Sequence, residues 1–207
     1  MSSNSTRTVP QADRIAKRRS QILKAASRTM TKKGYYGTSM QSVADEAGMS
    51  VGLIYQYYAN KDEVLEAVII DILGDFDRAV PPAMAAAGDG PEARIRAGFA
   101  AFVRIIDRKR AASLLAYRES QTLAPAAART IMRLETETID PFRQAVDDGI
   151  ELGLFRPVSA RLVAHNVKML AHGWALKHWD LVSHVTLDEY IDQELDILFA
   201  GLRSGGR

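Results

Sequence analysis

Cysteine is absent from all 207 residues. Disulfide bonds, thiolate metal sites and cysteine nucleophiles are therefore excluded. Long apolar runs are missing too: no segment approaches the roughly 18 uncharged apolar residues of a membrane-spanning helix, and the first residues, MSSNSTRTVPQADR, are polar. These absences favour a reducing compartment, so we expect a cytoplasmic protein without a membrane partner.

Charge is distributed unevenly along the chain, although the net charge is only +2. Residues 1–61 hold ten lysines and arginines against three acidic residues, a net charge of +7, whereas residues 62–207 carry −5. A basic segment attached to an acidic one is typical of a protein that meets a polyanion with one end. A solvated basic helix would give the same composition, and on charge alone it is the favoured interpretation.

Periodicity and capping signals near the start of the chain predict a long helix followed by a short one. Apolar residues recur at helical spacing over residues 12–33, and Gly34 follows as a C-terminal stop. Thr38 and Gln41 are spaced as a capping box for the second helix, which Gly48 ends.

The next segment, GMSVGLIYQYYANK, is rich in aromatic and β-branched residues and taken alone could form a strand. Its flanks favour a helix over residues 51–59, because Ser50 is a good N-cap and Asn60 with Glu63 caps a fourth helix that runs to about Val80. Two short helices joined by a turn, after a long basic one, form a helix-turn-helix. Ile54 and Tyr58 then face inward, and the outward aromatics need a partner such as DNA to cover them.

The run GTSMQSVADEAGMSVGLIYQYYANKDEVLEAVI resembles the DNA-binding domain of the TetR/AcrR family of bacterial repressors. In that family a helix ending A-x-x-A-G-(V/M)-S precedes x-G-x-(L/I)-Y-x-(Y/H)-(F/Y) and x-(N/S)-K-(E/D). The resemblance implies a ligand-responsive regulator that binds a double-stranded DNA operator. Tyr57 stands where the family usually has histidine, and a tyrosine hydroxyl can also donate to a phosphate.

The resemblance also implies which residues contact DNA. Contacts to phosphates are expected from Thr38, Tyr55, Tyr57 and Lys61. Base edges and thymine methyls are expected to be read by Gln41, Val51, Leu53 and Gln56. Ser50 caps the recognition helix, and Gly52 lets it lie close to the groove. Arg7 and Arg14 are candidates for the minor groove, although a solvated arm over residues 1–11 is the simpler interpretation.

The remaining sequence predicts an all-α body after a proline- and glycine-rich break, AVPPAMAAAGDGP. Helices are expected over residues 91–108, 111–123, 126–152, 160–179 and 187–202, and Thr186 with Glu189 forms a capping box for the last. We therefore expect a helix-turn-helix domain at residues 12–61 and a helical effector-binding and dimerisation domain at residues 62–207.

The last two helices have apolar faces, with Trp174 and Leu198 among them, that exceed what one small body needs to bury. The resemblance implies that they pair with a second subunit as a four-helix bundle. A homodimer would place two recognition helices in successive major grooves about 34 Å apart, which implies a pseudo-palindromic operator.

Chemical motifs are scarce in the body. His165 and His172 lie seven residues apart on one helical face and make a metal site conceivable, but surface or hydrogen-bonded histidines are far commoner. No cofactor fingerprint, nucleophile elbow or catalytic triad is present. We expect no metal, no cofactor and no enzyme activity.

In the family the effector pocket lies among the body helices. Candidate lining residues, most of which would serve equally well as core, are Phe99, Phe102, Val103, Ile106, Tyr117, Arg118, Phe142, Met169, Gly173 and Trp174. Arg118 and Glu119 would need partners if buried, either in a structural ion pair or through contact of Arg118 with the ligand.

The effector class is open at the level of sequence. The phrases LLAYRESQTL, DPFRQAVDDGIELGLFRP and MLAHGWALKHW are similar to a TetR subgroup that regulates fatty-acid or related acyl-CoA catabolism. A small apolar effector is therefore expected, with an acyl-CoA as first candidate and the basic run at residues 107–110 as a site for its phosphates. A regulator of drug efflux that responds to aromatic or cationic compounds is the alternative, and an all-α enzyme is less favoured.

Overall fold

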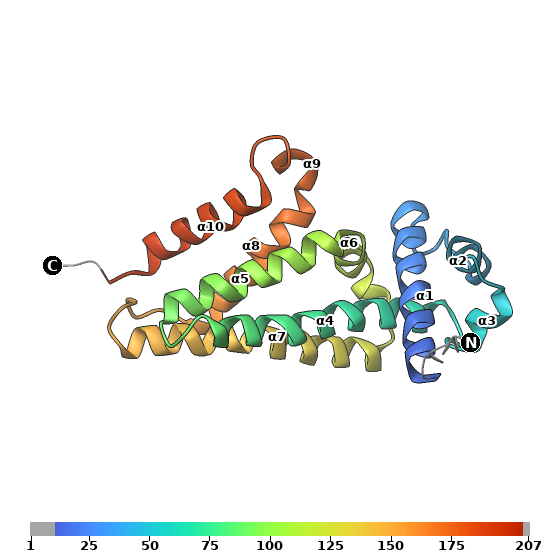
Figure 1. Ribbon diagram of the computed structural model, residues 1–207, viewed down its shortest axis with the longest axis horizontal. Helices are drawn as coiled ribbons and strands as arrows, with labels where there is room; N and C mark the ends of the chain where they lie inside the picture. Colours follow the sequence, from blue (N-terminus) through green and yellow to red (C-terminus); the bar gives the residue numbers. More distant parts are fainter. Residues whose placement is uncertain (1–10, 205–207) are drawn as a thin grey trace, which may run out of the picture. The chain divides into compact units, whose positions relative to one another are not determined.

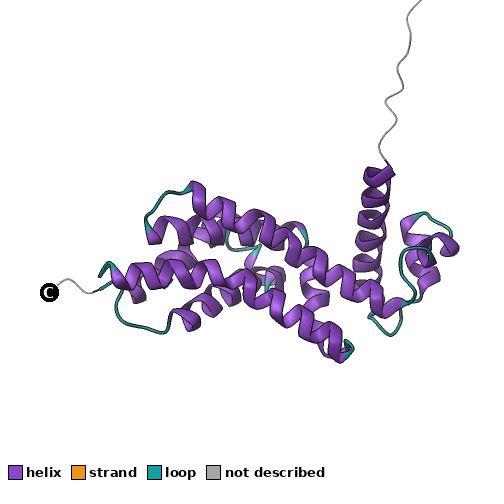
Figure 2. Cartoon of the chain, turned by 90° about the horizontal axis from the view of Figure 1, so that it is seen from below, coloured by secondary structure: helices purple, strands orange, loops and turns teal. Residues whose placement is uncertain are grey.

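The computed structural model describes residues 11–204 (Figure 1). Its regular elements within that range are all helical, as Figure 2 shows. The all-α fold expected from the sequence is confirmed. The chain divides into two compact units, one ending at Val68 and the other beginning at Ile69, so the division falls inside α4 (Lys61–Ala86). The arm expected over residues 1–11, with Arg7, lies outside the described residues except for Gln11.

The first unit is built from α1 (Gln11–Lys33), α2 (Met40–Ala47), α3 (Val51–Tyr55) and the start of α4. Only the second half of α1 contributes to the core, with Ile22, Ala26 and Met30 buried, whereas residues 11–21 are exposed. Gly48 has a φ of 65° and ends α2 in the left-handed conformation, which glycine adopts without strain. That turn fixes α3 against α2.

The capping box of α2 differs from the prediction by one residue. The Ser42 N–H donates to the Ser39 hydroxyl at 3.1 Å, and the Ser39 N–H donates to the Ser42 hydroxyl at 3.0 Å. The prediction of Thr38 and Gln41 is wrong, because the buried Thr38 hydroxyl donates instead to the Gly34 carbonyl at 2.8 Å. Ser42, three residues after the N-cap, accepts from the N-cap backbone N–H, a role that glutamine or glutamate usually has in a capping box.

The predicted break near Val80 is also wrong, since α4 continues through Pro81 and Pro82. Each proline removes one amide donor, which frees the carbonyls of Asp77 and Arg78. Both of those residues are exposed, so water can satisfy the freed carbonyls. Burial of Met84 further along α4 favours continuation of the helix.

The second unit continues from α4 into α5 (Pro91–Arg108), α6 (Arg110–Glu119), the short helix η1 (Ser120–Thr122) and α7 (Pro125–Glu151). It is completed by α8 (Ala160–Leu176), α9 (His178–Leu181) and α10 (Leu187–Leu202). Helix α5 is central, because it packs on α7, α8 and α10. Gly98 permits close packing there: a Cβ atom would lie 2.7 Å from the Met84 Cγ and 2.9 Å from the Phe142 Cε1.

Most predicted helices of this unit are confirmed, but two are divided. The segment expected over residues 111–123 consists of α6 followed by η1, and the one expected over residues 160–179 ends at Leu176. The capping box of α10 is confirmed, with the Thr186 N–H donating to Glu189 Oε2 at 2.8 Å and the Glu189 N–H donating to Thr186 Oγ1 at 3.2 Å.

Candidate nucleic-acid interface and a cavity in the C-terminal unit

The α3 helix directs most of its side chains outward. Ile54 is fully buried and Tyr58, in the turn after α3, is 4% exposed, as the sequence predicts. Tyr55 is 53% exposed, and Gly52 and Gln56 are exposed as well. The helix is shorter than predicted, because it ends at Tyr55 and leaves Gln56 as its C-cap. The result is a short helix with one buried residue and an open outer face.

The start of α4 holds a fixed cation. The Lys61 ammonium donates to the Tyr35 carbonyl at 3.0 Å and lies 4.3 Å from the centre of the Tyr35 ring. The Tyr35 hydroxyl in turn donates to the Asp62 carboxylate. Because an ammonium has three N–H donors, Lys61 keeps donors for a further acceptor. The Asn60 side chain caps α4 by accepting from the Glu63 N–H at 2.9 Å, as predicted.

The exposed part of α1 is strongly basic. Arg14, Lys17 and Arg18 are exposed and form no ion pair with any residue between 11 and 204. Arg19 lies with its guanidinium 5.9 Å from the centre of the Tyr58 ring. These cations, together with Lys61, give this unit a chemistry suited to an anionic polymer.

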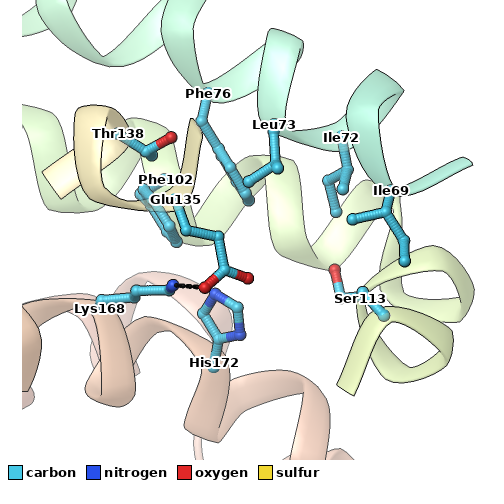
Figure 3. A pocket seen from close by; sticks show the side chains of 11 residues that line it. Ile69, Ile72, Leu73, Phe76, Phe102, Ser113, Glu135, Thr138, Lys168 and His172 are labelled. Atoms are coloured by element: carbon cyan, nitrogen blue, oxygen red, sulfur yellow. Dashed lines mark hydrogen bonds and ion pairs between the residues drawn. The ribbon is translucent and has the colours of Figure 1, made fainter. Parts of the chain in front are cut away.

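The second unit contains a small cavity between five helices (Figure 3). Its lining is apolar on α4 and α5, mixed on α6, and polar on α7 and α8. The lining residues are Ile69, Ile72, Leu73, Phe76, Phe102, Ser113, Ala116, Glu135, Thr138, Lys168 and His172. The cavity has a volume of about 20 Å³. That is room for about one water molecule.

One corner of the cavity is polar. The Lys168 ammonium donates to Glu135 Oε2 at 2.8 Å, and His172 lies beside this pair (Figure 3). The His172 ring is 5.7 Å from the centre of the Phe102 ring and 5.0 Å from that of Tyr117. Burial, and then the charge of Lys168, lowers the pKa of His172 to about 3, so the imidazole is neutral.

Comparison with known proteins identifies the family. A family model for bacterial regulatory proteins of the tetR family matches residues 22–68, and one for a tetracyclin repressor-like C-terminal domain matches residues 88–177. The HTH-type transcriptional regulator HbdR of Aromatoleum sp. (strain CIB) is 32% identical over 184 residues, which cover 89% of this chain and 80% of the relative. The chain belongs to the TetR family. It is a transcriptional regulator with a helix-turn-helix DNA-binding domain.

Solved structures of TetR-family proteins share this fold. A regulatory protein from Rhodococcus RHA1 superimposes with a TM-score of 0.80 at 20% identity, covering 92% of this chain and 99% of that one. AibR, solved in complex with isovaleryl coenzyme A and operator DNA, gives a TM-score of 0.77 at 24% identity and covers 88% and 98% of the two chains.

The residues expected to contact DNA differ in how exposed they are in this TetR-family regulator. Tyr55, Gln56 and Gly52 are exposed, and Val51, Leu53 and Tyr57 are half-buried. Ser50 caps α3, accepting from the Leu53 N–H at 3.3 Å. Two residues are engaged within the protein: Thr38 with Gly34, as described above, and Gln41, whose amide donates to Asp45 Oδ1 at 2.7 Å.

Of the candidate effector-contact residues, only Phe102 lines the cavity described here. Four others are buried in the surrounding core: Phe99, Val103, Ile106 and Phe142. Trp174 is buried too, and its indole N–H donates to Asp107 Oδ1 at 2.9 Å. At Gly173 a Cβ atom would lie 2.8 Å from the Tyr190 hydroxyl.

The remaining candidates lie nearer the surface. Tyr117 is 38% exposed and Met169 50% exposed, and the Tyr117 hydroxyl donates to the Met169 sulfur at 3.2 Å. Arg118 is exposed, and neither it nor Glu119 forms an ion pair with any described residue. Arg118 and Glu119 therefore do not form a buried ion pair.

Sequence reasoning missed the polar corner of the cavity. Lys168 did not stand out, and Glu135 was expected on a solvated helix face. His172 was expected as a surface or hydrogen-bonded histidine, with a metal site shared with His165 as the less favoured alternative. Within residues 11–204 no cluster of three or more potential metal-binding side chains occurs, and no helix in that range is long and apolar enough to span a bilayer. A usable signal was present, because Lys168 and His172 are one helical turn apart beside the apolar stripe of α8.

The basic run at the end of α5 is largely neutralised. Lys109 forms ion pairs with Asp71 and Asp75 on α4, and Arg110 lies 3.5 Å from Asp107. Burial opposes ionisation of Asp75, but hydrogen bonds from Lys109 and Arg78 outweigh it and lower the pKa of that carboxyl. Arg108 is exposed and has no ion-pair partner among the described residues.

Proposed function

We propose that this TetR-family regulator is a homodimeric repressor that an apolar effector, with an acyl-CoA as first candidate, releases from a pseudo-palindromic operator. The observation that carries the proposal is the cavity. Four of its lining residues lie on α4, the helix whose first residues belong to the DNA-binding unit. An effector that separates α4 from α5 to α8 changes the conformation of a helix shared by both units. Differential affinity for two conformations is what allows a ligand to shift their populations.

The outer face of α3 supports the DNA-binding half of the proposal. Exposed Tyr55 and Gln56 flank a position, Gly52, that has no side chain to hold the helix away from a groove, and nothing lies within 4 Å of a Cβ atom built there. Tyr57 and Lys61 follow in positions suited to phosphate contact. The exposed cations of α1 add sequence-independent affinity.

Exposed apolar side chains on α8 and α10 support pairing of two protomers. Leu162 is 61% exposed, Met169 50% and Ile197 71%. Trp174, which the sequence suggested as part of this surface, is buried within the protomer instead. A second copy of the chain would remove the exposed apolar side chains from water.

The chemistry of the cavity favours a neutral apolar effector over a cationic drug. Its carboxylate, Glu135, is already paired with Lys168, so a cation that enters would compete with a bound ammonium. An acyl group fits apolar walls with one polar corner, and Arg108 offers a solvated cation for a phosphate. The structurally similar AibR was solved with isovaleryl coenzyme A.

The proposal is tested by titrating a labelled operator complex with effector candidates and following fluorescence anisotropy. The candidates are saturated, aromatic and steroid-like coenzyme A thioesters, the corresponding free acids, and cationic aromatic drugs. Release by at least one thioester, and by none of the free acids or drugs at the same concentration, is expected. Release by a cationic or free aromatic compound alone would replace the acyl-CoA assignment with the efflux one.

A further inference from the structure

The polar side chains that line the cavity differ in whether their hydrogen-bonding groups are already used. The Ser113 hydroxyl donates to the Lys109 carbonyl at 3.2 Å, and the Thr138 hydroxyl donates to the Leu134 carbonyl at 2.8 Å. Lys168 and Glu135 satisfy each other. His172 is different, because neither ring nitrogen has a hydrogen-bond partner among the described residues and both nitrogens are buried.

An imidazole in this state is unusual in a folded protein. More than nine in ten buried polar groups have a partner, and leaving one unsatisfied is destabilising. The neutral ring offers one N–H donor and one acceptor nitrogen at the same place. A hydroxyl group can meet either nitrogen, and a carbonyl oxygen can accept from the N–H.

We infer that His172 determines effector specificity, and that the part of the effector that enters the cavity carries a neutral hydrogen-bonding group, a hydroxyl or a carbonyl, which this ring binds. The inference rests on the proposed function, since it concerns the same cavity. A purely hydrocarbon group would leave both ring nitrogens without a partner. A hydroxylated acyl group that enters as the helices separate would give one of them a partner.

A charged group is disfavoured in the same position. A carboxylate beside His172 would compete with Glu135 for Lys168, and an ammonium would compete with Lys168 for Glu135, so either charge would disturb the existing pair. The ring itself stays uncharged at neutral pH, because burial lowers its pKa to about 3. The ring also packs beside Phe102 and Tyr117, with ring centres 5.7 Å and 5.0 Å away.

The test compares two matched pairs of thioesters: butyryl- with 3-hydroxybutyryl-coenzyme A, and phenylacetyl- with 4-hydroxyphenylacetyl-coenzyme A. The wild-type protein should be released from DNA by the hydroxylated member of at least one pair at a roughly tenfold lower concentration, the value of about one hydrogen bond. His172→Leu, which has similar bulk and no polar atom, should lose this preference. His172→Gln, which keeps a donor and an acceptor, should retain part of it.

A second measurement needs no effector. If His172 is kept for ligand contact at the expense of stability, the ligand-free His172→Leu protein should melt about 2–4 °C above wild type. A lower melting temperature would overturn the inference, because it would mean that the ring already makes favourable contacts.

The two proposals fail in different ways. Equal release by both members of both pairs, or a preference that His172→Leu retains, would overturn the role of His172 and leave the acyl-CoA regulator intact. Release by none of the four thioesters, nor by any in the wider panel, would overturn the acyl-CoA assignment, and the melting temperature of His172→Leu would then decide the inference about His172.

Discussion

The Lys61 side chain is held by Tyr35: its ammonium lies 3.0 Å from the Tyr35 carbonyl oxygen and 4.3 Å from the centre of the Tyr35 ring. A lysine on a flexible stem is thereby converted into a positioned cation at the start of α4. Its contact with DNA is a proposal that follows from this geometry and from the family motif.

Lys61→Ala should weaken binding to operator and random duplexes alike. Because the expected contact is to a phosphate, the plot of log affinity against log salt concentration should lose about one unit of slope. Anisotropy titrations at several salt concentrations measure this. Lys177→Ala removes the same charge from an exposed site in the other unit and serves as the control. An unchanged slope in Lys61→Ala would refute the contact.

Gln56→Ala should change preference among operator variants while leaving affinity for random DNA nearly unaltered. The side chain is exposed and forms no side-chain hydrogen bond with the described residues, so it is available to a base edge. Loss of one such contact corresponds to about 1–3 kcal/mol of discrimination. Gln41→Ala should have a smaller effect, since Gln41 must first leave Asp45. A uniform loss across all sequences would assign Gln56 to the phosphates.

Ile197→Glu should yield monomers and abolish operator binding. The residue is 71% exposed on α10, and a charge there cannot be buried between two protomers without a large cost. Analytical ultracentrifugation at micromolar concentration measures the change. Met132→Glu, at a 66% exposed position on α7, should remain a dimer. A wild-type protein that sediments as a stable monomer would exclude the proposed pairing.

Stability should depend on pH through His172. Its pKa is about 3 in the folded protein, lowered chiefly by burial and further by Lys168, against an ordinary value of 6.5. The unfolded chain therefore binds more protons between pH 6.5 and pH 3, so the free energy of unfolding falls as pH drops below about 6.5 and is constant above it.

The protonation of His172 alone should lower the free energy of unfolding by about 2 kcal/mol between pH 7 and pH 5. Urea unfolding of wild type and of His172→Leu at both pH values isolates the effect, because Lys168 and Glu135 are present in both proteins. The wild type should lose more stability than the variant. Equal losses would show that the ring can be protonated in the folded state.

Arg108→Ala should raise the thioester concentration needed for release by roughly three- to tenfold, the value of about one surface charge-assisted contact. DNA binding without effector should not change. Lys109→Ala should behave differently and lower the melting temperature, because it leaves Asp71 and Asp75 without their shared cation. If Arg108→Ala responds like wild type, the phosphates are bound elsewhere.

Local signals were sufficient for the helix-turn-helix unit. Gly48 at the end of α2, the Ser50 cap and the inward spacing of Ile54 and Tyr58 all act within a few residues, and all were predicted correctly. The predicted capping box of α2 was wrong by one residue. The Thr38 hydroxyl donates to the Gly34 carbonyl instead, and only the folded turn brings that acceptor within reach.

The continuation of α4 and the composition of the cavity depend on tertiary contacts, which could not be predicted from the sequence. Proline at positions 81 and 82 argues for a helix end, yet packing of Met84 against α5 at Gly98 stabilises continuation. The cavity combines residues from α4 to α8, from Ile69 to His172, that are far apart in the sequence. Its polar corner depends on which acidic residue meets Lys168. Periodicity on a single helix does not contain that information.

The small volume of the cavity has a kinetic consequence. With room for about one water molecule, the cavity would admit the proposed acyl group only after helices separate, and the frequency of that opening would limit how fast the effector binds. The observed association rate should then level off at high effector concentration instead of rising in proportion to it.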